Sequence, residues 1–251
     1  MQERAGARFA NLVMQYLEKN HAVDTKPISC LLCGHDTLTE VYCGEGNRVT
    51  LCQHCSLVFL NPQPTKAAYR AYYEQEYEHN RHKVVTYDEA IARLEKRQSY
   101  ERKKKYLNEF EKYISARSRV LEVGSGWGTL LRVIHDEFKC AVQGIEVAAI
   151  AAEVSVKHYG IAIFQGLFDE YTAKHPHEKF DMIILHHVLE HMTRPIETIK
   201  KLKSIMAPDG CLAIAVPNMA TPDEPLDRFF RMEHCAYFTP WTFHKLVRAE
   251  E

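Results

Sequence analysis

The stretch that most constrains the fold of this chain runs from residue 119 to 128 and reads RVLEVGSGWG. Its first half is a short apolar run that is typical of a buried strand. Three glycines follow in close spacing, and residues 129–138 (TLLRVIHDEF) then carry apolar side chains at helical intervals. Glycine permits a sharp turn and a close approach to a ligand because it has no Cβ atom. The sequence therefore predicts a strand, a glycine turn and a helix, the unit that holds adenosine cofactors in α/β folds.

The spacing of these glycines narrows the choice of cofactor. A dinucleotide fingerprint (GxGxxG) needs its third glycine where this chain has Thr129, and no phosphate-binding lysine of a P-loop follows. The pattern is GxGxG instead, with Glu122 two residues before Gly124. This segment resembles motif I of class I S-adenosylmethionine (SAM) methyltransferases, in which the acid and the glycines frame the methionine and ribose portions of SAM. The alternative is a glycine turn in an unrelated α/β protein.

Short apolar strands alternate with helices after residue 118. We expect further strands over 141–147, 161–164, 180–185 and 211–216, and a last helix over 241–251. Continuous apolar character indicates strands that are buried on both faces, and the alternation with helices predicts an α/β fold with a doubly wound, Rossmann-like parallel sheet. The sequence ends before the last two strands that class I methyltransferases usually have. We therefore expect an exposed edge at the fifth strand, which either pairs with a second copy in a homo-oligomer or is covered by the predicted helix over 9–17.

Further residues at the ends of these strands are candidates for cofactor binding. Glu146 lies twenty residues beyond Gly126, at the end of the second strand, where an acid accepts hydrogen bonds from ribose hydroxyls. Enzymes that bind NAD share this feature. Leu167 and Phe168 follow the third strand, where methyltransferases shape the adenine pocket, although an ordinary core position is an equal alternative. The full cofactor-binding set is Glu122, Gly124, Ser125, Gly126, Trp127, Glu146, Leu167, Phe168 and His186.

Two later segments place histidines next to acidic residues. The fourth strand runs into HHVLEH (186–191), and a further segment reads EHCAYFTP (233–240). The first resembles the "LEH" segment of ubiquinone-biosynthesis-type SAM O-methyltransferases, and the second an "EHxxYFTP" segment of their bacterial relatives. An oxygen or carbon acceptor must lose a proton, and histidine titrates near neutral pH. The catalytic candidates are His234, His187 and His191, and a structural role in the loop is the alternative for His191.

Four cysteines have the spacing of a structural metal site. Two CxxC pairs, at 30–33 and 52–55, are separated by eighteen residues. Four thiolates suit tetrahedral Zn²⁺ with no open position, so we expect a structural zinc ribbon with hairpin strands over 39–42 and 48–51. The alternative is a set of buried free cysteines. The predicted ligands are Cys30, Cys33, Cys52 and Cys55, and the candidate substitute ligands are His35, Cys43 and His54.

The ribbon adds a second resemblance. Together with LVFLNPQP (57–64) and the tyrosines that follow, it resembles the zinc-bearing branch of SAM methyltransferases, which includes sugar C-methyltransferases. The match extends from Cys30 to the end of the chain. Two positions depart from the patterns of these families. His187 stands at the first acidic position of the Glu-x-x-Glu-His metal motif of the ubiquinone-type enzymes, and Arg231 stands where sugar C-methyltransferases tend to have a tyrosine.

The remaining segments complete the predicted organisation. Apolar residues over 9–17 form an amphipathic pattern, and residues 88–115 read as one long helix whose basic face is solvated. The tyrosines over 69–87 indicate packing or an aromatic wall beside the substrate. The predicted domains are an N-terminal amphipathic helix (1–25), a zinc ribbon (26–64), a helical connector (65–117) and a SAM-binding methyltransferase domain (118–251).

The composition of the chain excludes several classes of protein. The 251 residues are 46% hydrophobic with a net charge of −1, which disfavours a general polyanion binder and so a nucleic-acid partner. No apolar run has the length of a membrane span, and charged residues interrupt the start of the chain where a signal peptide would be apolar. The eight cysteines then read as thiols or metal ligands in a reducing cytoplasm.

These observations predict a SAM-dependent methyltransferase with SAM and structural Zn²⁺ as cofactors. The resemblance implies a small polar acceptor, with a sugar or nucleotide-sugar as the preferred class. One alternative is an O-methyltransferase of an aromatic or quinone-like metabolite. A second alternative is a catalytically idle adaptor that keeps the SAM fold and uses the ribbon to bind a partner.

Overall fold

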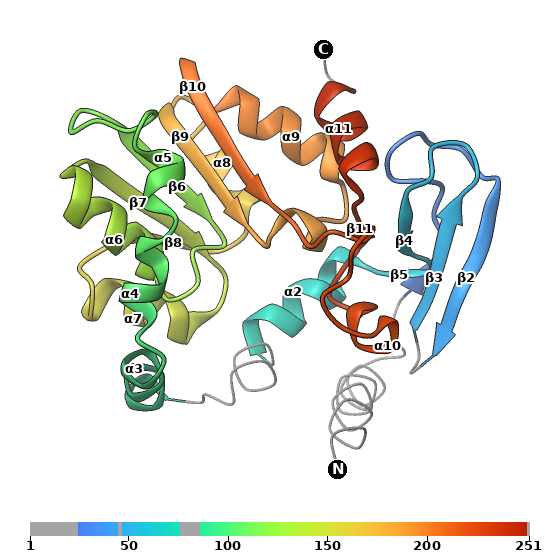
Figure 1. Cartoon of the computed structure of the whole chain (residues 1–251), viewed down its shortest axis with the longest axis horizontal. Coiled ribbons are helices and arrows are strands. Elements are labelled where there is room, and N and C mark those ends of the chain that lie inside the picture. The colour runs from blue at the N-terminus through green and yellow to red at the C-terminus, as the bar shows by residue number, and fades with distance from the viewer. Residues whose placement is uncertain (1–24, 45–46, 76–85, 250–251) are drawn as a thin grey trace. The chain divides into compact units, whose positions relative to one another are not determined.

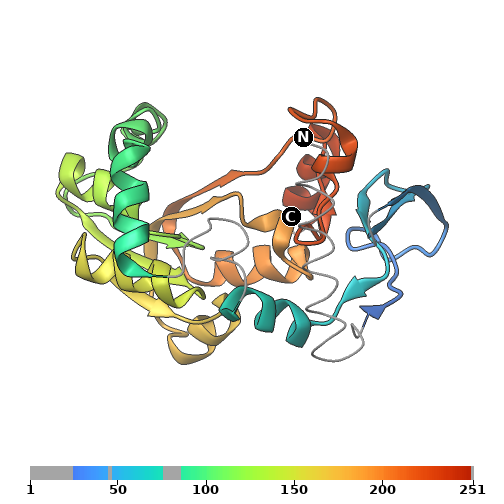
Figure 2. The ribbon, with the colours of Figure 1, turned by 90° about the horizontal axis from the view of Figure 1, so that it is seen from below.

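The computed structural model describes residues 25–44, 47–75 and 86–249, which form two compact units (Figures 1 and 2). Neither unit is continuous in the sequence. The ribbon unit contains the described parts of 1–71 together with 189–200 and 216–251, and the sheet unit contains the described parts of 72–188 together with 201–215. The predicted helix over 9–17 lies outside the described residues.

The sheet unit is built on five parallel strands. They are β6 (Arg119–Val123), β7 (Ala141–Glu146), β8 (Ala162–Gln165), β9 (Phe180–His186) and β10 (Met206–Ala215). Their spatial order is β10-β9-β6-β7-β8, and every neighbouring pair is parallel. This confirms the predicted doubly wound, Rossmann-like sheet. The order reverses between β6 and β9, and such a switch point is where open α/β sheets bind their ligands.

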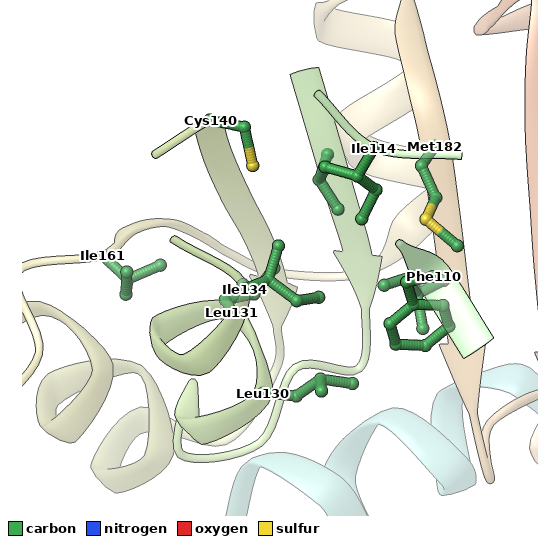
Figure 3. Packing of buried hydrophobic residues seen from close by; sticks show 10 residues of the cluster. Phe110, Ile114, Leu130, Leu131, Ile134, Cys140, Ile161 and Met182 are labelled. Carbon is green, nitrogen blue, oxygen red and sulfur yellow. The ribbon is translucent and has the colours of Figure 1, made fainter. Parts of the chain in front are cut away.

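Four helices connect these strands. They are α6 (Thr129–Phe138), α7 (Ala149–Lys157), α8 (Phe168–Lys174) and α9 (Pro195–Ser204), and the residues of α9 up to 200 belong to the ribbon unit. Helices α6 and α7 lie against β7 and β8. Leu130, Leu131 and Ile134 on α6 pack with Phe110 and Met182 in one cluster of buried side chains (Figure 3). Each fully buried side chain of this kind contributes about 1.5–3 kcal/mol to folding. The packing therefore fixes the strand, turn and helix that the sequence predicts over 119–138.

The segment before β6 differs from its prediction. In place of one helix over 88–115, the structure has α3 (Tyr87–Lys96), α4 (Ser99–Lys104) and α5 (Leu107–Phe110). The break follows Arg97, because Gln98 has a φ of 48° in the left-handed region. The hydroxyl of Tyr100, just after the break, donates to Asp136 on α6 at 2.8 Å. Tertiary contacts of this kind outweigh the helical propensity of the segment.

The ribbon unit contains a four-stranded antiparallel sheet. Its strands are β2 (Leu38–Gly44), β3 (Asn47–Cys52), β4 (Val58–Leu60) and β11 (Ala236–Tyr237), in the order β11-β4-β3-β2. The hairpin of β2 and β3 confirms the predicted one. A separate pair joins β1 (Thr25–Lys26) to β5 (Gln63–Pro64). The unit also contains the start of α2 (Lys66–Gln75), the 3₁₀ helix η2 (Leu189–His191), α10 (Leu226–Phe229) and α11 (Pro240–Arg248).

The C-terminal segment is part of the ribbon unit. Ala236 pairs with Phe59 and Tyr237 pairs with Val58, so β11 extends the ribbon sheet. Phe229, Phe230 and Tyr237 share a buried cluster with Val49 and Val58. The predicted domain over 118–251 therefore differs from the compact units of the structure, in which 189–200 and 216–251 belong to the ribbon unit. The reason is that a two-residue strand has no sequence signal of its own.

Two further features concern surfaces. Strand β10 lies at one end of the sheet order with half-buried side chains, and self-association along its edge remains a prediction. Within the described ranges, no helix has the length and apolar character needed to cross a membrane.

Candidate active site

A glycine loop follows β6 at the switch point of the sheet. Gly124, Gly126 and Gly128 have φ values of 67°, 54° and 72°, a region that L side chains rarely adopt. A Cβ atom on Gly124 would lie 2.6 Å from Val188 Cγ2, and one on Gly128 would lie 2.6 Å from Ser155 Oγ. A Cβ atom on Gly126 would meet nothing within 4 Å. The loop therefore requires glycine on both flanks and leaves open space at its centre.

Glu146 holds this loop from the end of β7. Its Oε2 accepts a hydrogen bond from the Gly126 N–H at 2.8 Å, and its Oε1 accepts from Val147 and Ala148 at 2.8 and 2.9 Å. Burial raises the pKa of Glu146, and these three N–H groups act in the opposite direction. A carboxylate oxygen has a second lone pair, so each oxygen can also accept from a ligand hydroxyl.

Glu122 is a second buried carboxyl beside the loop. It is 3% exposed on β6, and burial raises its pKa to about 8. The carboxyl therefore carries a proton at neutral pH. Within the described part of the chain, no hydrogen-bond partner reaches Glu122 Oε2 or the buried hydroxyl of Ser125. Buried polar groups are normally satisfied, so these two atoms and the space at Gly126 fit a polar ligand such as SAM.

The other predicted cofactor residues lie in two settings. Trp127 packs partly buried against the cluster of Ala90, Leu94 and Val154, and Phe168 is buried at the start of α8. Leu167 is half-buried directly before this helix. Side chains at these positions can either pack in the core or line the wall of a cofactor pocket, so their role in cofactor binding stays a prediction.

His186 ends β9 in contact with Tyr106, which the sequence does not indicate as a site residue. Its ring meets the Tyr106 ring edge-on at 5.0 Å. Burial lowers the pKa of His186 to about 4, and the positive charge of Lys103 acts in the same direction. Lys103 also lies close enough to act on the charge of Glu122. The sequence predicts Tyr106 as an apolar position of the helix over 88–115, and no local pattern indicates that it meets the end of a strand.

A histidine cluster lies in the ribbon unit. The rings of His191 and His234 are 4.9 Å apart at 75°, and His191 Nε2 is 3.9 Å from Glu190 Oε1. Glu190 is 2% exposed, whereas both histidines are half-buried. One ligand atom from each of the three residues lies within 4.8 Å of the others, a spacing that can hold a metal ion. His187, the third catalytic candidate, belongs to the sheet unit and is exposed with a φ of 59°.

Backbone hydrogen bonds fix this cluster. His191 Nδ1 donates to the Glu233 carbonyl at 2.8 Å, because a carbonyl can only accept. The other ring nitrogen, Nε2, is the one that faces Glu190. The Cys235 N–H donates to the Glu190 carbonyl at 2.7 Å. η2 and the segment around His234 are thus held as one piece.

Three further hydrogen bonds, from Leu60, Gln63 and Tyr69, hold the segment around His234. The Leu60 N–H and the Gln63 side-chain amide both donate to the Cys235 carbonyl, at 3.1 and 3.0 Å. The Tyr69 hydroxyl donates to the Met232 carbonyl at 2.9 Å. The segment LVFLNPQP and the tyrosine after it therefore position the EHCAYFTP segment.

The four predicted metal ligands come together. Cys30 Sγ lies 3.4 Å from Cys55 Sγ, and Cys33 Sγ lies 3.5 Å from Cys52 Sγ. A tetrahedral zinc–thiolate site has sulfur atoms about 3.8 Å apart, as follows from Zn–S bonds of about 2.3 Å. All four cysteines are free thiols within one group of potential ligands. Burial opposes ionisation of Cys52, but N–H groups of Cys55 and His54 lower its pKa to about 7.

The candidate substitute ligands are not members of the four-cysteine group. His35 and His54 stand beside the four-cysteine group and form a separate group with Cys33. Cys43 is exposed on β2 and belongs to none of the groups found among the described residues.

Comparison with known proteins gives the context for these sites. A family model described as a methyltransferase domain matches residues 91–250. Two curated relatives are both ubiquinone biosynthesis O-methyltransferases. The one from Actinobacillus pleuropneumoniae serotype 5b (strain L20) is 31% identical over 109 residues, which cover 40% of this chain and 46% of the relative. The one from Haemophilus ducreyi is 30% identical over 112 residues, which cover 40% and 45%. The match thus spans less than half the length of these relatives.

Solved structures share the fold. A SAM-dependent methyltransferase from Archaeoglobus fulgidus matches with a TM-score of 0.53 at 20% identity, covering 63% of this chain and 72% of the other. The plantazolicin methyltransferase BpumL in complex with SAH matches with a TM-score of 0.53 at 13% identity, covering 72% of each chain. Because the family model covers well over half of its residues, the chain belongs to the methyltransferase domain family and has the Rossmann-like fold of class I SAM methyltransferases.

Proposed function

We propose that this protein binds SAM at the glycine loop and transfers the methyl group to a small polar acceptor. The observation that carries this proposal is the open glycine turn at Gly126, bounded by the two buried carboxyl groups of Glu122 and Glu146. This arrangement lies at the switch point of a five-stranded parallel sheet. The family match gives independent support.

The chain supplies binding and orientation for this reaction. SAM, when bound, supplies a methyl group that its sulfonium already activates. Glu146 would hold the ribose hydroxyls through the free lone pairs of its carboxylate. The neutral carboxyl of Glu122 and the Ser125 hydroxyl would satisfy polar atoms of the methionine portion. The left-handed glycines let the backbone approach the cofactor closely.

His234 would serve the acceptor side. An acceptor oxygen or carbon must release a proton during methylation, and an imidazole next to a buried carboxylate can take it. Glu190 and His191 lie within 4.8 Å of His234 and would orient it and stabilise its charged form. His234 is half-buried, so part of its side chain is accessible to a small molecule.

The acceptor class is the finer part of the proposal. A sugar or nucleotide-sugar is favoured by the ribbon, LVFLNPQP and the tyrosines that follow, which together resemble the zinc-bearing branch of these enzymes. An aromatic or quinone-like acceptor is the second candidate, because the curated relatives named above are ubiquinone biosynthesis O-methyltransferases. The group of Glu190, His191 and His234 suits either a proton acceptor or a bound cation that polarises the acceptor.

A structural zinc ion is also part of the proposal. Cys30, Cys33, Cys52 and Cys55 have the spacing and the softness that Zn²⁺ prefers. With four protein ligands there is no open position, so the ion would stabilise the ribbon and take no part in chemistry.

The test is a methyl-transfer assay with isotope-labelled SAM and two acceptor panels, nucleotide-sugars and catechol-type aromatics. We expect transfer to one panel that is lost in His234→Ala. His244→Ala is the matched control, because His244 is an exposed histidine of the same unit. Binding of SAM without transfer to any member of either panel would favour an idle adaptor and contradict the proposal.

A further inference from the structure

Two exposed histidines lie beside the four-cysteine group. His35 follows Cys33 by two residues, and His54 stands inside the second CxxC pair. Their rings stack with centroids 3.7 Å apart and planes at 7°. One ligand atom from His35, one from His54 and the sulfur of Cys33 lie within 4.8 Å of one another. The two knuckles of the ribbon therefore bring two further ligands, His35 and His54, close to the Cys33 sulfur.

We propose that Cys33, His35 and His54 form a second transition-metal site, which shares the Cys33 thiolate with the structural zinc. The inference rests on the four-thiolate zinc of the proposed function and goes beyond it. Thiolate and imidazole together select borderline ions such as Zn²⁺ over Mg²⁺ or Ca²⁺.

The position of Cys33 suits a shared ligand. Cys30, Cys52 and Cys55 are buried, whereas Cys33 is half-buried. Its sulfur therefore has access to the surface on which both histidines lie. A thiolate sulfur has three lone pairs, so it can bind one metal inside the ribbon and a second one on the outside.

One histidine is already oriented for metal binding. His35 Nδ1 lies 3.2 Å from the carbonyl oxygen of Cys33, which can only accept a hydrogen bond. The proton is therefore on Nδ1 and the lone pair on Nε2. Metal-binding histidines are usually held in this manner, with the second ring nitrogen bonded to a carbonyl or carboxylate.

The distances require only a small adjustment. Two nitrogens on one tetrahedral Zn²⁺ lie about 3.3 Å apart, as follows from Zn–N bonds of about 2.0–2.1 Å. Parallel rings do not direct their lone pairs at one point, so one ring must turn. His54 is exposed, so its ring can turn out of the stack while His35 keeps its hydrogen bond to the Cys33 carbonyl. Three protein ligands leave a fourth position for water, which makes this an open site.

Calorimetric titration of Zn²⁺ into the metal-free full-length protein tests the proposal. We expect two transitions of one equivalent each, of which the second is weaker. His35→Ala and His54→Ala should each weaken the second transition by about tenfold or more and leave the first unchanged. His177→Ala is the control, because His177 is an exposed histidine of the sheet unit. It should preserve both transitions.

Cobalt(II) provides the second readout. If Cys33 is shared, the thiolate-to-cobalt charge-transfer absorption should rise further with the second equivalent in the wild type but not in His54→Ala. A single transition in the wild type, or a second one that both histidine variants retain, would overturn the second site alone. Absence of the first transition would overturn the four-cysteine site and this proposal with it.

Discussion

His191 and His234 come from separate stretches of the chain, yet their rings lie 4.9 Å apart with planes at 75°. Between them, the Glu233 carbonyl accepts the His191 Nδ1 proton at 2.8 Å, and the Glu190 carbonyl accepts the Cys235 N–H at 2.7 Å. This reciprocal pairing joins the LEH and EHCAYFTP segments into one element. It gives a physical reason why the two motifs occur together in one chain.

Replacement of His234 should separate catalysis from cofactor binding. We expect His234→Ala to lower turnover by about 10²–10⁴-fold, the usual effect of losing a general base. Its affinity for SAM should stay unchanged, because the proposed role of His234 is toward the acceptor and not toward the cofactor. Steady-state kinetics together with calorimetry would measure both quantities. Full turnover in the variant, or a parallel loss of SAM affinity, would contradict this role.

Removal of the zinc should disable the same site indirectly. The ribbon residues Leu60 and Gln63 hold the Cys235 carbonyl, so unfolding of the ribbon should release His234. Structural zinc contributes about 10–16 kcal/mol in small domains, which is comparable to the whole stability of a typical fold. We expect Cys52→Ser to expose the ribbon to proteolysis and to abolish turnover while SAM still binds.

Cys43→Ser is the matched control for this experiment, because Cys43 is an exposed thiol on β2 of the same ribbon. It should keep its zinc, its protease resistance and its turnover. A Cys52→Ser protein that contains one zinc per chain and resists proteolysis would show that the four-cysteine site is assigned wrongly.

The buried carboxyl of Glu122 should make stability depend on pH. In the unfolded chain it ionises near its ordinary pKa of 4.5, whereas burial keeps the folded carboxyl protonated up to about pH 8. Its contribution to the free energy of unfolding is therefore fully present below pH 4.5 and is lost as the pH rises to about 8. The loss is about 1.4 kcal/mol per pH unit within this window.

Urea denaturation of the wild type and Glu122→Gln at pH 5.5, 6.5 and 7.5 would measure this effect. The glutamine cannot ionise, so the variant should lack this part of the pH dependence and gain stability relative to the wild type as the pH rises. Parallel pH profiles for the two proteins would show that Glu122 ionises freely in the folded state.

Local patterns predicted the sheet unit well. The apolar strand 119–123 is followed directly by its glycines, so β6, the turn and α6 depend on neighbouring residues alone. The four cysteines likewise carry their own spacing, and the structure brings their sulfurs together. The roles proposed for the individual site residues remain predictions, which the binding and turnover measurements on their variants would test.

Long-range pairings explain what the sequence did not predict. β11 has two residues, and its pairing with β4 joins positions that are distant in the chain. The left-handed residue Gln98 interrupts a segment whose composition favours a continuous helix. The contact of Tyr106 with His186 depends on that interruption and on the placement of α5 beside the sheet. No local pattern contains this information.

The most direct test of the central claim is calorimetry of SAM and NAD binding to the wild type and Glu146→Ala. We expect the wild type to bind one SAM and no NAD, and the variant to lose about 1.5–3 kcal/mol of SAM affinity, the value of a charge-assisted hydrogen bond. Glu153→Ala, which removes a carboxylate from the surface of α7, should bind SAM as the wild type does. Binding of NAD in place of SAM, or equal SAM affinity in the wild type and Glu146→Ala, would contradict the account.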